Sequence, residues 1–452
     1  MLKRKMYQTL SQWHMNSHKA FLVTGARQVG KSYVVREFGK AHYQAFVEYN
    51  LILDKEARRI LTQAESAADF ISRVALLSPE PLIEGDTLIF VDEIQECPDI
   101  VTLAKALVED GRYSYAFSGS MLGTEFKGVT SFPVGYVDQY VMRPMDFEEF
   151  CWAEGIQEDT LARIREAFVA RAPVEGYLHD VMMKHFRAYV VVGGMPEVVQ
   201  NFVDGGGSLA RTRALQSALV AQYEQDISKY AGTRAFHVRS IFDQIPVQLT
   251  DESHRFAVTS LGATVRYTAY DKDFLWVVNA GVGLKVDRVS EPKSPLRRTR
   301  KASLFKLYES DTGMLLSRYP QSLARAVYLN ERRANLGGVF ENVVAQEIAA
   351  HGKELYYYGG DEGHEVDFLI EGRRGHVVPI EVKSGKRVRQ HASLDRLMAS
   401  GAYGMSEAVV LCGNNLSCEG GVTYVPYYMT FCLDELTERE DDGFVIAPPM
   451  PV

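Results

Sequence analysis

A glycine-bounded stretch near the start of the chain has the residue types of a phosphate-binding loop. Residues 25–32 read GARQVGKS and fit the pattern G-x-x-x-x-G-K-[ST], between an apolar run and a helix-like segment. A tight glycine turn lets several backbone N–H groups converge on phosphate oxygens, and the following helix N-terminus adds positive potential. We expect Lys31 to reach the β- and γ-phosphates of a nucleotide and the Ser32 hydroxyl to bind Mg²⁺. The alternative is an ordinary glycine turn between a strand and a helix.

The residues expected to contact the nucleotide form one continuous segment. They are the loop and the residue after it, namely Gly25, Ala26, Arg27, Gln28, Val29, Gly30, Lys31, Ser32 and Tyr33. Arg27 and Arg143 are also candidate cations for the transition state of hydrolysis, with a structural or surface role as the alternative for each.

Two adjacent acids supply the second half of such a site. Asp92 and Glu93 follow four apolar residues in the segment LIFVDEIQ, at the expected carboxyl end of a buried strand. Carboxyl ends of parallel strands face the ligand crevice, so we expect Asp92 to hold the Mg²⁺ shell. Glu93 can orient and polarise the attacking water. Ser118 ends the next strand and can sense the γ-phosphate, although a plain Ser/Gly turn explains it equally well.

Charged residues also gather in the C-terminal segment 365–385, EVDFLIEGRRGHVVPIEVKSG, which predicts two short strands joined by a turn. Successive strand residues face opposite sides, and a turn centred near Arg374 places Asp367 opposite Glu381. Like charges across a strand pair are destabilising, and a divalent cation relieves the repulsion. Lys383 relieves it in part.

This arrangement fits the metal-binding pattern D-(x)n-E-x-K. The pattern resembles the metal-binding core of restriction-endonuclease-like folds. That resemblance implies that Asp367 and Glu381 would hold a metal ion, that Glu341 in a predicted helix would add a third acid, and that Lys383 would stabilise the attacking water or the phosphate charge. The alternative is a buried network of ion pairs, in which a lysine between two acids is an ordinary salt-bridge arrangement.

Alternating strands and helices must position the nucleotide site. Apolar runs predict strands at 19–24, 45–51, 86–95, 113–120 and 137–143, with helical segments between them. Such alternation is typical of an α/β fold with a parallel sheet. We therefore assign residues 1–145 to a P-loop ATPase core.

The remaining chain divides into three segments by composition and periodicity. Residues 146–203 form a predicted helical lid, and 204–300 a helical or winged-helix-like linker domain that opens with the flexible stretch DGGGS at 204–208. Residues 301–452 form a final α/β domain. Basic stretches at 293–301 and 383–396 can meet a phosphate backbone, or they are solvated surface.

Composition narrows the class of protein. The net charge of −8 argues against a general nucleic-acid binder. Five cysteines without metal-ligand spacing predict free thiols in a reducing compartment, and we expect a cytoplasmic protein. No apolar run reaches the roughly 18 residues that a membrane span needs, so no membrane partner is expected.

Several motifs occur in an order that resembles a known family. They include RKMYQTLSQW, FLVTGARQVGKS, FVDEIQECP, FSGSMLG, PMDFEEF, VVGGMPEVV, FKLYESDTGML and GGVFENVVAQEI, followed by EVDFLI and PIEVKSGK. The chain resembles prokaryotic ATP-binding proteins with an N-terminal AAA-type ATPase domain and a C-terminal domain similar to restriction-endonuclease-like folds. The resemblance covers nearly the whole chain and is vague between about 205 and 300.

The resemblance implies ATP and Mg²⁺ at Gly25–Ser32 and Asp92, with Glu93 as the hydrolytic carboxylate. Family members often carry Gly-Arg or Gly-Lys before the PMDFEEF segment, where this chain has Gly135 and Tyr136. This chain therefore has no basic residue at that position to act on a neighbouring subunit. Assembly into an active ring of subunits does not follow from the resemblance.

These observations predict an ATP-hydrolysing switch or motor coupled to a nuclease-like domain that acts on DNA or RNA, with a homo-oligomer as a possible assembly. Binding of the γ-phosphate at Lys31 would reposition the C-terminal domain through the 204–208 hinge. The alternative is a nucleotide-dependent regulatory or binding module whose nuclease-like domain is inactive and docks a protein partner. A transporter-associated or metabolic ATPase would need a membrane or small-molecule feature that the sequence does not show.

Overall fold

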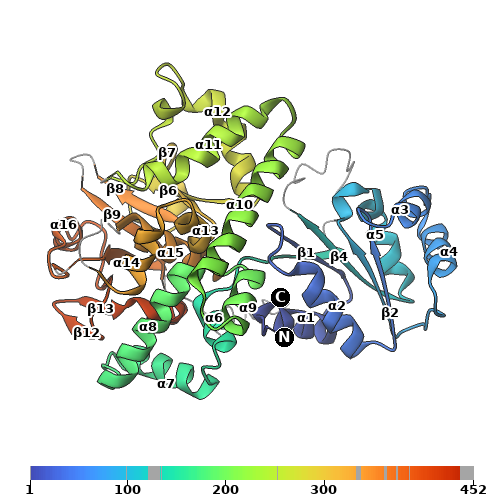
Figure 1. The fold of residues 1–452 in the computed structure, drawn as a ribbon, viewed down its shortest axis with the longest axis horizontal. Helices are drawn as coiled ribbons and strands as arrows, with labels where there is room; N and C mark the ends of the chain where they lie inside the picture. The colour runs from blue at the N-terminus through green and yellow to red at the C-terminus, as the bar shows by residue number, and fades with distance from the viewer. Residues whose placement is uncertain are drawn as a thin grey trace, which may run out of the picture.

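The computed structural model describes residues 2–97, 99–120, 133, 135–251, 253–331, 337–360, 364–372, 375–385 and 387–437. Two lobes are visible, each built on a sheet (Figure 1). One lobe holds the N-terminal strands, and the other holds a larger sheet together with most of the later helices.

The N-terminal sheet is parallel, as the strand and helix alternation predicts. Its order is β2-β3-β4-β1-β5. The strands are β1 (Ala20–Gly25), β2 (Ala45–Asn50), β3 (Thr87–Asp92), β4 (Ser114–Ser120) and β5 (Val137–Val141). Every residue of β1 and β3 is buried, which explains their continuous apolar runs.

Helices cover both faces of this sheet. On one face, α1 (Lys5–Asn16) and α2 (Lys31–His42) pack against alternate strand residues such as Phe21 and Phe90. The other face carries α3 (Lys55–Leu61), α4 (Ala67–Leu77) and α5 (Asp99–Asp110), which pack against the intervening residues. A short 3-10 helix, η1 (Ile94–Glu96), follows β3. The period-two alternation of each strand therefore divides its side chains between two hydrophobic clusters.

The middle of the chain is helical. It contains α6 (Phe147–Ala153), α7 (Glu158–Val169), α8 (Gly176–Val192), α9 (Pro196–Asp204), α10 (Leu209–Tyr230), η3 (Gly232–Arg234), α11 (Ala235–Gln248), η4 (Val258–Leu261) and α12 (Tyr267–Asn279). The glycine-rich stretch at 204–208 forms the turn between α9 and α10, closed by the N–H of Gly207 donating to Phe202 O at 3.0 Å.

The second sheet has eight strands in the order β12-β13-β11-β10-β9-β8-β6-β7. The strands are β6 (Gly283–Val289), β7 (Arg300–Glu309), β8 (Tyr356–Gly359), β9 (Glu365–Glu371), β10 (Val377–Lys383), β11 (Ala408–Cys412), β12 (Ser417–Glu419) and β13 (Val422–Pro426). Pairs β6/β8, β10/β11 and β11/β13 are parallel, and the others are antiparallel. The sheet is accompanied by η5 (Leu296–Thr299), α13 (Thr312–Ser317), α14 (Gln321–Tyr328), α15 (Gly337–Ala350), α16 (Ala392–Ala399) and η7 (Tyr427–Leu436).

Strands from two of the expected segments share this sheet. Strand β6 lies in the segment 204–300, and it pairs antiparallel with β7, whose register runs from Gly283 opposite Glu309 to Val289 opposite Arg300. The boundary expected at residue 300 thus falls within a pair of hydrogen-bonded strands. Because a sheet needs both partners of a pair, the two segments form one structural unit here.

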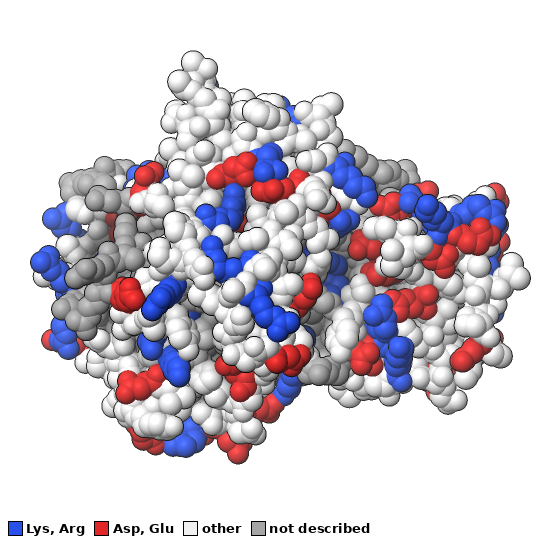
Figure 2. Space-filling model, in the orientation of Figure 1, with Lys and Arg blue, Asp and Glu red and all other residues white. Residues whose placement is uncertain are grey.

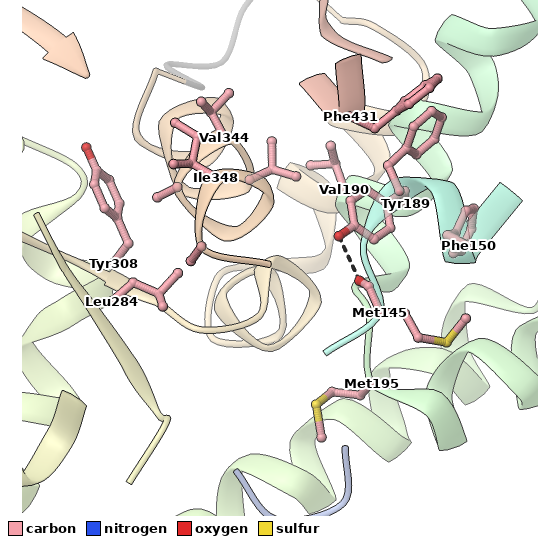
Figure 3. Packing of buried hydrophobic residues seen from close by; sticks show 14 of the residues in the cluster. Met145, Phe150, Tyr189, Val190, Met195, Leu284, Tyr308, Val344, Ile348 and Phe431 are labelled. Carbon is pink, nitrogen blue, oxygen red and sulfur yellow. Dashed lines mark hydrogen bonds between the residues drawn. The ribbon is translucent and has the colours of Figure 1, made fainter. Parts of the chain in front are cut away.

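One hydrophobic core joins this unit to the N-terminal lobe. Figure 3 shows Val344 and Ile348 of α15 between Leu284 and Tyr308 on one side and Tyr189 and Phe150 of the helical middle on the other. The Tyr189 hydroxyl donates to Met145 O at 2.9 Å. The same cluster reaches α1 and α2 on one side and β6 on the other.

Two motifs that are far apart in the sequence meet at this core. The N–H of Gly194, in VVGGMPE, donates to Asp311 Oδ2 at 2.5 Å, and Asp311 lies in ESDTGML. A Cβ at Gly194 would lie 2.0 Å from Met145 O, so a side chain does not fit there. The glycine is required by the close approach of two backbones.

Candidate functional site

Strand register brings the predicted nucleotide-site residues to one edge of the N-terminal sheet. Asn50 pairs with Asp92 between β2 and β3, and Gly25 pairs with Ser120 between β1 and β4. The pairing of Val91 with Phe117 places Asp92 beside Ser118. Because these strands are parallel, all of these residues lie at their carboxyl ends.

The loop between β1 and α2 has the backbone of a tight turn. Gly25 and Gly30 have positive φ of 146° and 97°, and a Cβ at Gly25 would lie 2.1 Å from Met142 O. Lys31, which begins α2, is only 6% exposed, and its Nζ donates to Gly25 O at 3.0 Å and Ala26 O at 2.8 Å. The lysine therefore spans the loop, as the sequence motif requires.

Burial lowers the pKa of Lys31 to about 8, while the carboxylates of Glu93 and Asp92 act in the opposite direction. The lysine and both acids are thus within electrostatic reach of one another. At neutral pH most of the Lys31 population keeps its charge, which is the form that binds phosphate.

Asp92 is held in place by several donors. Asn50 Nδ2 donates to Oδ2 at 2.8 Å, and the N–H of Glu93 and the Ser118 hydroxyl donate to Oδ1. Ser118 was predicted as a phosphate sensor, but here its hydroxyl orients the Asp92 carboxylate. Asp92 is 2% exposed, so these bonds fix its direction at the strand end.

Glu93 sits in a left-handed conformation with φ of 58°, which is uncommon for a residue with a side chain. Its Oε2 accepts from Gln95 Nε2, which also lies 3.3 Å from the Ser120 hydroxyl. Gln95 was not predicted as a site residue. Only the positions of the folded strands show that it bridges Glu93 to the end of β4.

Arg4 is a second residue that the sequence did not single out. Its Nη1 donates to Val29 O at 2.6 Å, its Nη2 to Arg143 O at 2.8 Å and its Nε to Glu149 Oε2 at 3.0 Å. The residue is 8% exposed. Arg4 therefore ties the phosphate loop to the segment before α6, and the basic opening of the chain was its only sequence signal.

The two candidate transition-state cations are placed differently. Arg27 donates to Asp226 and, at 2.8 Å, to the Tyr230 hydroxyl of α10, so it belongs to an ion pair. Arg143 is half-buried, and burial lowers its pKa. Its backbone carbonyl, rather than its side chain, carries the contact with Arg4.

The C-terminal acids meet as the strand alternation predicts. The β9/β10 ladder ends at Phe368 opposite Ile380, so the next step places Asp367 opposite Glu381. The N–H of Val382 donates to Asp367 Oδ2 at 2.9 Å. The expected turn centre at Arg374 lies outside the described residues.

Lys306 of β7 lies among these acids and was not predicted. Its Nζ is 3.1 Å from Glu341 Oε2, 2.8 Å from Glu365 Oε1 and 3.4 Å from Asp367 Oδ1. Its side chain is 1% exposed. The acidic cluster of Glu341, Glu365, Asp367 and Glu381 therefore contains a buried ammonium group.

Glu341 has a full set of partners. It accepts from the Tyr308 hydroxyl at 2.6 Å and lies 2.9 Å from His254 Nδ1, in addition to Lys306. Burial alone would raise its pKa, but the charge of Lys306 and these bonds lower it to about 2. This acid is held ionised without a metal.

The outer acids of the cluster also have cationic partners. Lys383 Nζ lies 2.7 Å from Glu381 Oε1, and Arg255 Nη2 lies 2.6 Å from Glu365 Oε2. Burial raises the pKa of Glu381, and Lys383 opposes that shift. For Asp367, burial and the charges of Glu341 and Glu381 raise the pKa, and Lys306 opposes them.

The donor set does not fit a second metal ion. Within the described ranges, no group of three or more His, Cys, Asp or Glu side chains is arranged to hold one. Of the predicted ligands, Glu341 and Asp367 contact Lys306 instead, and Glu381 pairs with Lys383. The Mg²⁺ predicted at Ser32 and Asp92 is a different case, because water and nucleotide phosphates would complete its coordination.

The basic stretch at 293–301 is largely neutralised by neighbouring acids. Arg298 pairs with Glu291 at 3.0 Å, Arg300 with Asp287 at 3.3 Å, and Arg297 with Glu354. Acidic and basic side chains are interspersed on the face drawn in Figure 2. These contacts weaken the case for a phosphate-backbone groove here.

Comparisons with known proteins identify the N-terminal part of the chain. Residues 17–151 match an AAA domain family, 183–323 match a domain of unknown function (DUF8612), and 336–429 match another domain of unknown function (DUF4143). No curated protein sequence matches the chain. The N-terminal region thus matches an AAA domain and contains the P-loop motif, while the other two families name no activity.

Solved structures with a detectable likeness are distant. The Walker-type ATPase PABY2304 of Pyrococcus abyssi is similar over 70% of this chain and 96% of its own, at 13% identity and a TM-score of 0.43. Orc1 of Aeropyrum pernix, solved in complex with DNA, is similar over 73% and 91%, at 13% identity and 0.26. A RuvB mutant of Thermotoga maritima is similar over 62% and 87%, at 12% identity and 0.27. None of these carries an argument about activity.

Among the helices in the described part of the chain, none has both the length and the apolar character needed to span a bilayer.

Proposed function

We propose that this protein binds Mg-ATP at Gly25–Ser32 and hydrolyses it. The observation that carries the proposal is the strand order, in which β4 separates β1 from β3 and brings Lys31, Asp92 and Glu93 into one electrostatic group. The match of residues 17–151 to an AAA domain family supports the same activity.

Each residue has a role that follows from its position. The Lys31 ammonium and the N-terminus of α2 bind the β- and γ-phosphates, while the Ser32 hydroxyl and Asp92 hold Mg²⁺. When bound, Mg²⁺ neutralises charge on the phosphate oxygens. Glu93 orients and deprotonates the attacking water, and Gln95 sets the direction of the Glu93 carboxylate.

Nucleotide binding and phosphate release, measured separately, test the proposal. Lys31→Ala should lose ATP binding, whereas Glu93→Gln should keep binding and lower kcat about 100-fold or more. Glu96→Gln is a matched control, because Glu96 ends the 3-10 helix that Glu93 precedes but pairs with Arg58 at 2.7 Å. Unchanged turnover in Glu93→Gln would remove Glu93 from the mechanism.

For the C-terminal unit, a nuclease-like domain acting on DNA or RNA and a non-cleaving module that docks a protein partner are the two candidates. The contact of Lys306 with Glu341, Glu365 and Asp367 favours the second, because an ammonium group stands where a nuclease would need a metal ion. The nucleotide state of the ATPase domain would then control binding of the protein partner.

A cleavage assay on the full chain separates these candidates. DNA and RNA are incubated with Mg²⁺ or Mn²⁺, with and without ATP, beside the Asp367→Ala variant. We expect no cleavage above that of the variant. Cleavage by the wild-type protein that Asp367→Ala abolishes would establish the nuclease instead.

Location and assembly complete the proposal. The five cysteines are free thiols, and four of them are buried, which suits a reducing compartment such as the cytoplasm. A homo-oligomer that forms with nucleotide is compatible with an AAA-type domain. Light scattering with and without ATP measures the oligomeric state.

A further inference from the structure

The phosphate loop is held from outside the ATPase domain by helix α10. Arg27 donates to Asp226 and Tyr230, the Tyr223 hydroxyl donates to Arg27 O at 3.0 Å, and Gln28 Nε2 donates to Gln222 Oε1. Residues 17–151 match the AAA domain family, and α10 lies within the next matched region at 183–323. Figure 1 shows α10 standing between the two sheets.

A second element closes the loop from another side. A Cβ at Gly281 would lie 3.1 Å from both the backbone nitrogen and the Cβ of Ala26, so the two backbones are in close contact. Gly281 precedes β6 of the larger sheet. Both contacts reach the loop from the unit that also carries the acidic cluster.

These contacts reach a loop residue with an uncommon backbone conformation. Gln28 has a positive φ of 63°, an unfavourable backbone state for a residue with a side chain. Its side-chain bond to Gln222 and the neighbouring Arg27–Asp226 pair stabilise this state. Asp226 is 5% exposed, so loss of Arg27 would leave a buried acid without its main partner.

The contact also lies close to the hydrolytic acid. Burial raises the pKa of Asp226, Arg27 and Lys229 oppose this shift, and the charge of Glu93 adds to it. Asp226 and Glu93 are therefore within electrostatic reach, with Arg27 paired to Asp226. A change in charge at the nucleotide phosphates therefore alters the electrostatic energy of Glu93, Asp226 and Arg27.

The other half of α10 is bound to the end of α8 and to α13 of the C-terminal unit. Gln216 Nε2 donates to Val191 O and Val192 O, each at 2.9 Å. Arg213 donates to the carbonyls of Leu316, Ser317 and Tyr319 at the end of α13. One helix thus joins the phosphate loop to the elements that flank the larger sheet.

We infer that Asp226, Tyr230 and Gln222 are positioning residues for the phosphate loop, and that α10 reports nucleotide occupancy to the C-terminal unit. The inference rests on the proposed ATP binding. Since linkage is reciprocal, contacts that preform the loop raise ATP affinity, and ATP binding must in turn stabilise this position of α10. The connection runs through the body of α10 and does not require motion at 204–208.

ATP affinity and hydrogen exchange on the full chain test this inference. Asp226→Asn and Gln222→Ala should each raise the Kd for ATP about fivefold or more, the low end of measured couplings, with a smaller effect on kcat. Glu224→Gln is the matched control, because Glu224 lies on the same helix and pairs with Arg239 at 2.8 Å. ATP should increase amide protection at 312–319 in the control but not in Asp226→Asn.

A double-mutant cycle sharpens the result. Arg27→Ala and Asp226→Ala should together raise the Kd little more than Arg27→Ala alone, because both changes remove the Arg27–Asp226 ion pair. Additive effects, or Kd values equal to that of the control, would overturn the inference. If the wild-type protein does not bind ATP, it is the proposed function that fails; wild-type binding with unaffected variants rejects α10 alone.

Discussion

Removal of Lys306 should convert the acidic cluster into a metal-dependent site. The Nζ of Lys306 lies within 3.4 Å of Glu341, Glu365 and Asp367, and the residue is 1% exposed. Breaking a buried ion pair by removing one partner costs about 3–5 kcal/mol, because the remaining charge stays out of water. Lys306→Met, which keeps much of the side-chain volume, should therefore lower the free energy of unfolding by that amount.

Lys306→Ala opens space beside the same carboxylates. We expect Mn²⁺ to bind there and stabilise the folded state by about 2.7 kcal/mol at a concentration 100 times its Kd. The wild-type protein should gain nothing, because its own ammonium holds the acids. The measurement is urea unfolding followed by fluorescence, in EDTA and in a Mn²⁺ series, without nucleotide.

Lys285→Ala provides the control, because Lys285 lies on the neighbouring strand β6 and pairs with Asp287 at 2.7 Å. Its stability should be independent of Mn²⁺. The reasoning fails if Mn²⁺ stabilises the wild-type protein as much as Lys306→Ala. It also fails if Lys306→Met unfolds at the wild-type urea concentration, since Lys306 would then compensate no buried charge.

Further predictions concern the loop, the core and the pH dependence. Arg4→Lys should weaken ATP binding, because an ammonium cannot reproduce the fork that holds Val29 O, and a nucleotide titration measures the change. Gly194→Ala should lower the free energy of unfolding by about 1–3 kcal/mol through overpacking, whereas Gly176→Ala, with open space around it, should not; urea unfolding compares them. Burial raises the pKa of Glu309 to about 7, against the charge of Arg318, so the folded state binds this proton more tightly than the unfolded state. The difference in unfolding free energy between wild type and Glu309→Gln should therefore fall by about 3 kcal/mol as pH rises from about 4.5 to 7, and a flat difference across that range would contradict the assignment.

Local patterns were sufficient to predict the ATPase lobe. The central strands β1 and β3 appear as apolar runs, and the spacing within GARQVGKS specifies a turn that only certain backbone angles allow. These features depend on residues close together in the chain. The side chains that complete the site, Arg4, Gln95 and Asp226, come from separate elements, and no local pattern marks them.

The C-terminal acidic cluster shows the same limit, because local sequence patterns do not reveal side chains that come from a separate element. Strand alternation correctly placed Asp367 opposite Glu381, because the side-chain period of a strand leaves no other choice once the turn is set. Strand alternation could not show that β7 brings Lys306 into contact with Asp367. That strand lies 61 residues from Asp367 in sequence and joins the sheet through β6 and β8.

By itself, the sequence predicted a phosphate-binding loop and the face of a strand that carries the C-terminal acids, because both follow from short-range geometry. The tertiary structure decided what those acids meet and what holds the phosphate loop. Lys306 lies among the acids, and side chains of α10 form hydrogen bonds with Arg27 and Gln28. The physical reason is that a buried charge is compensated by whichever element folding places beside it, and that choice is made by packing across the whole chain.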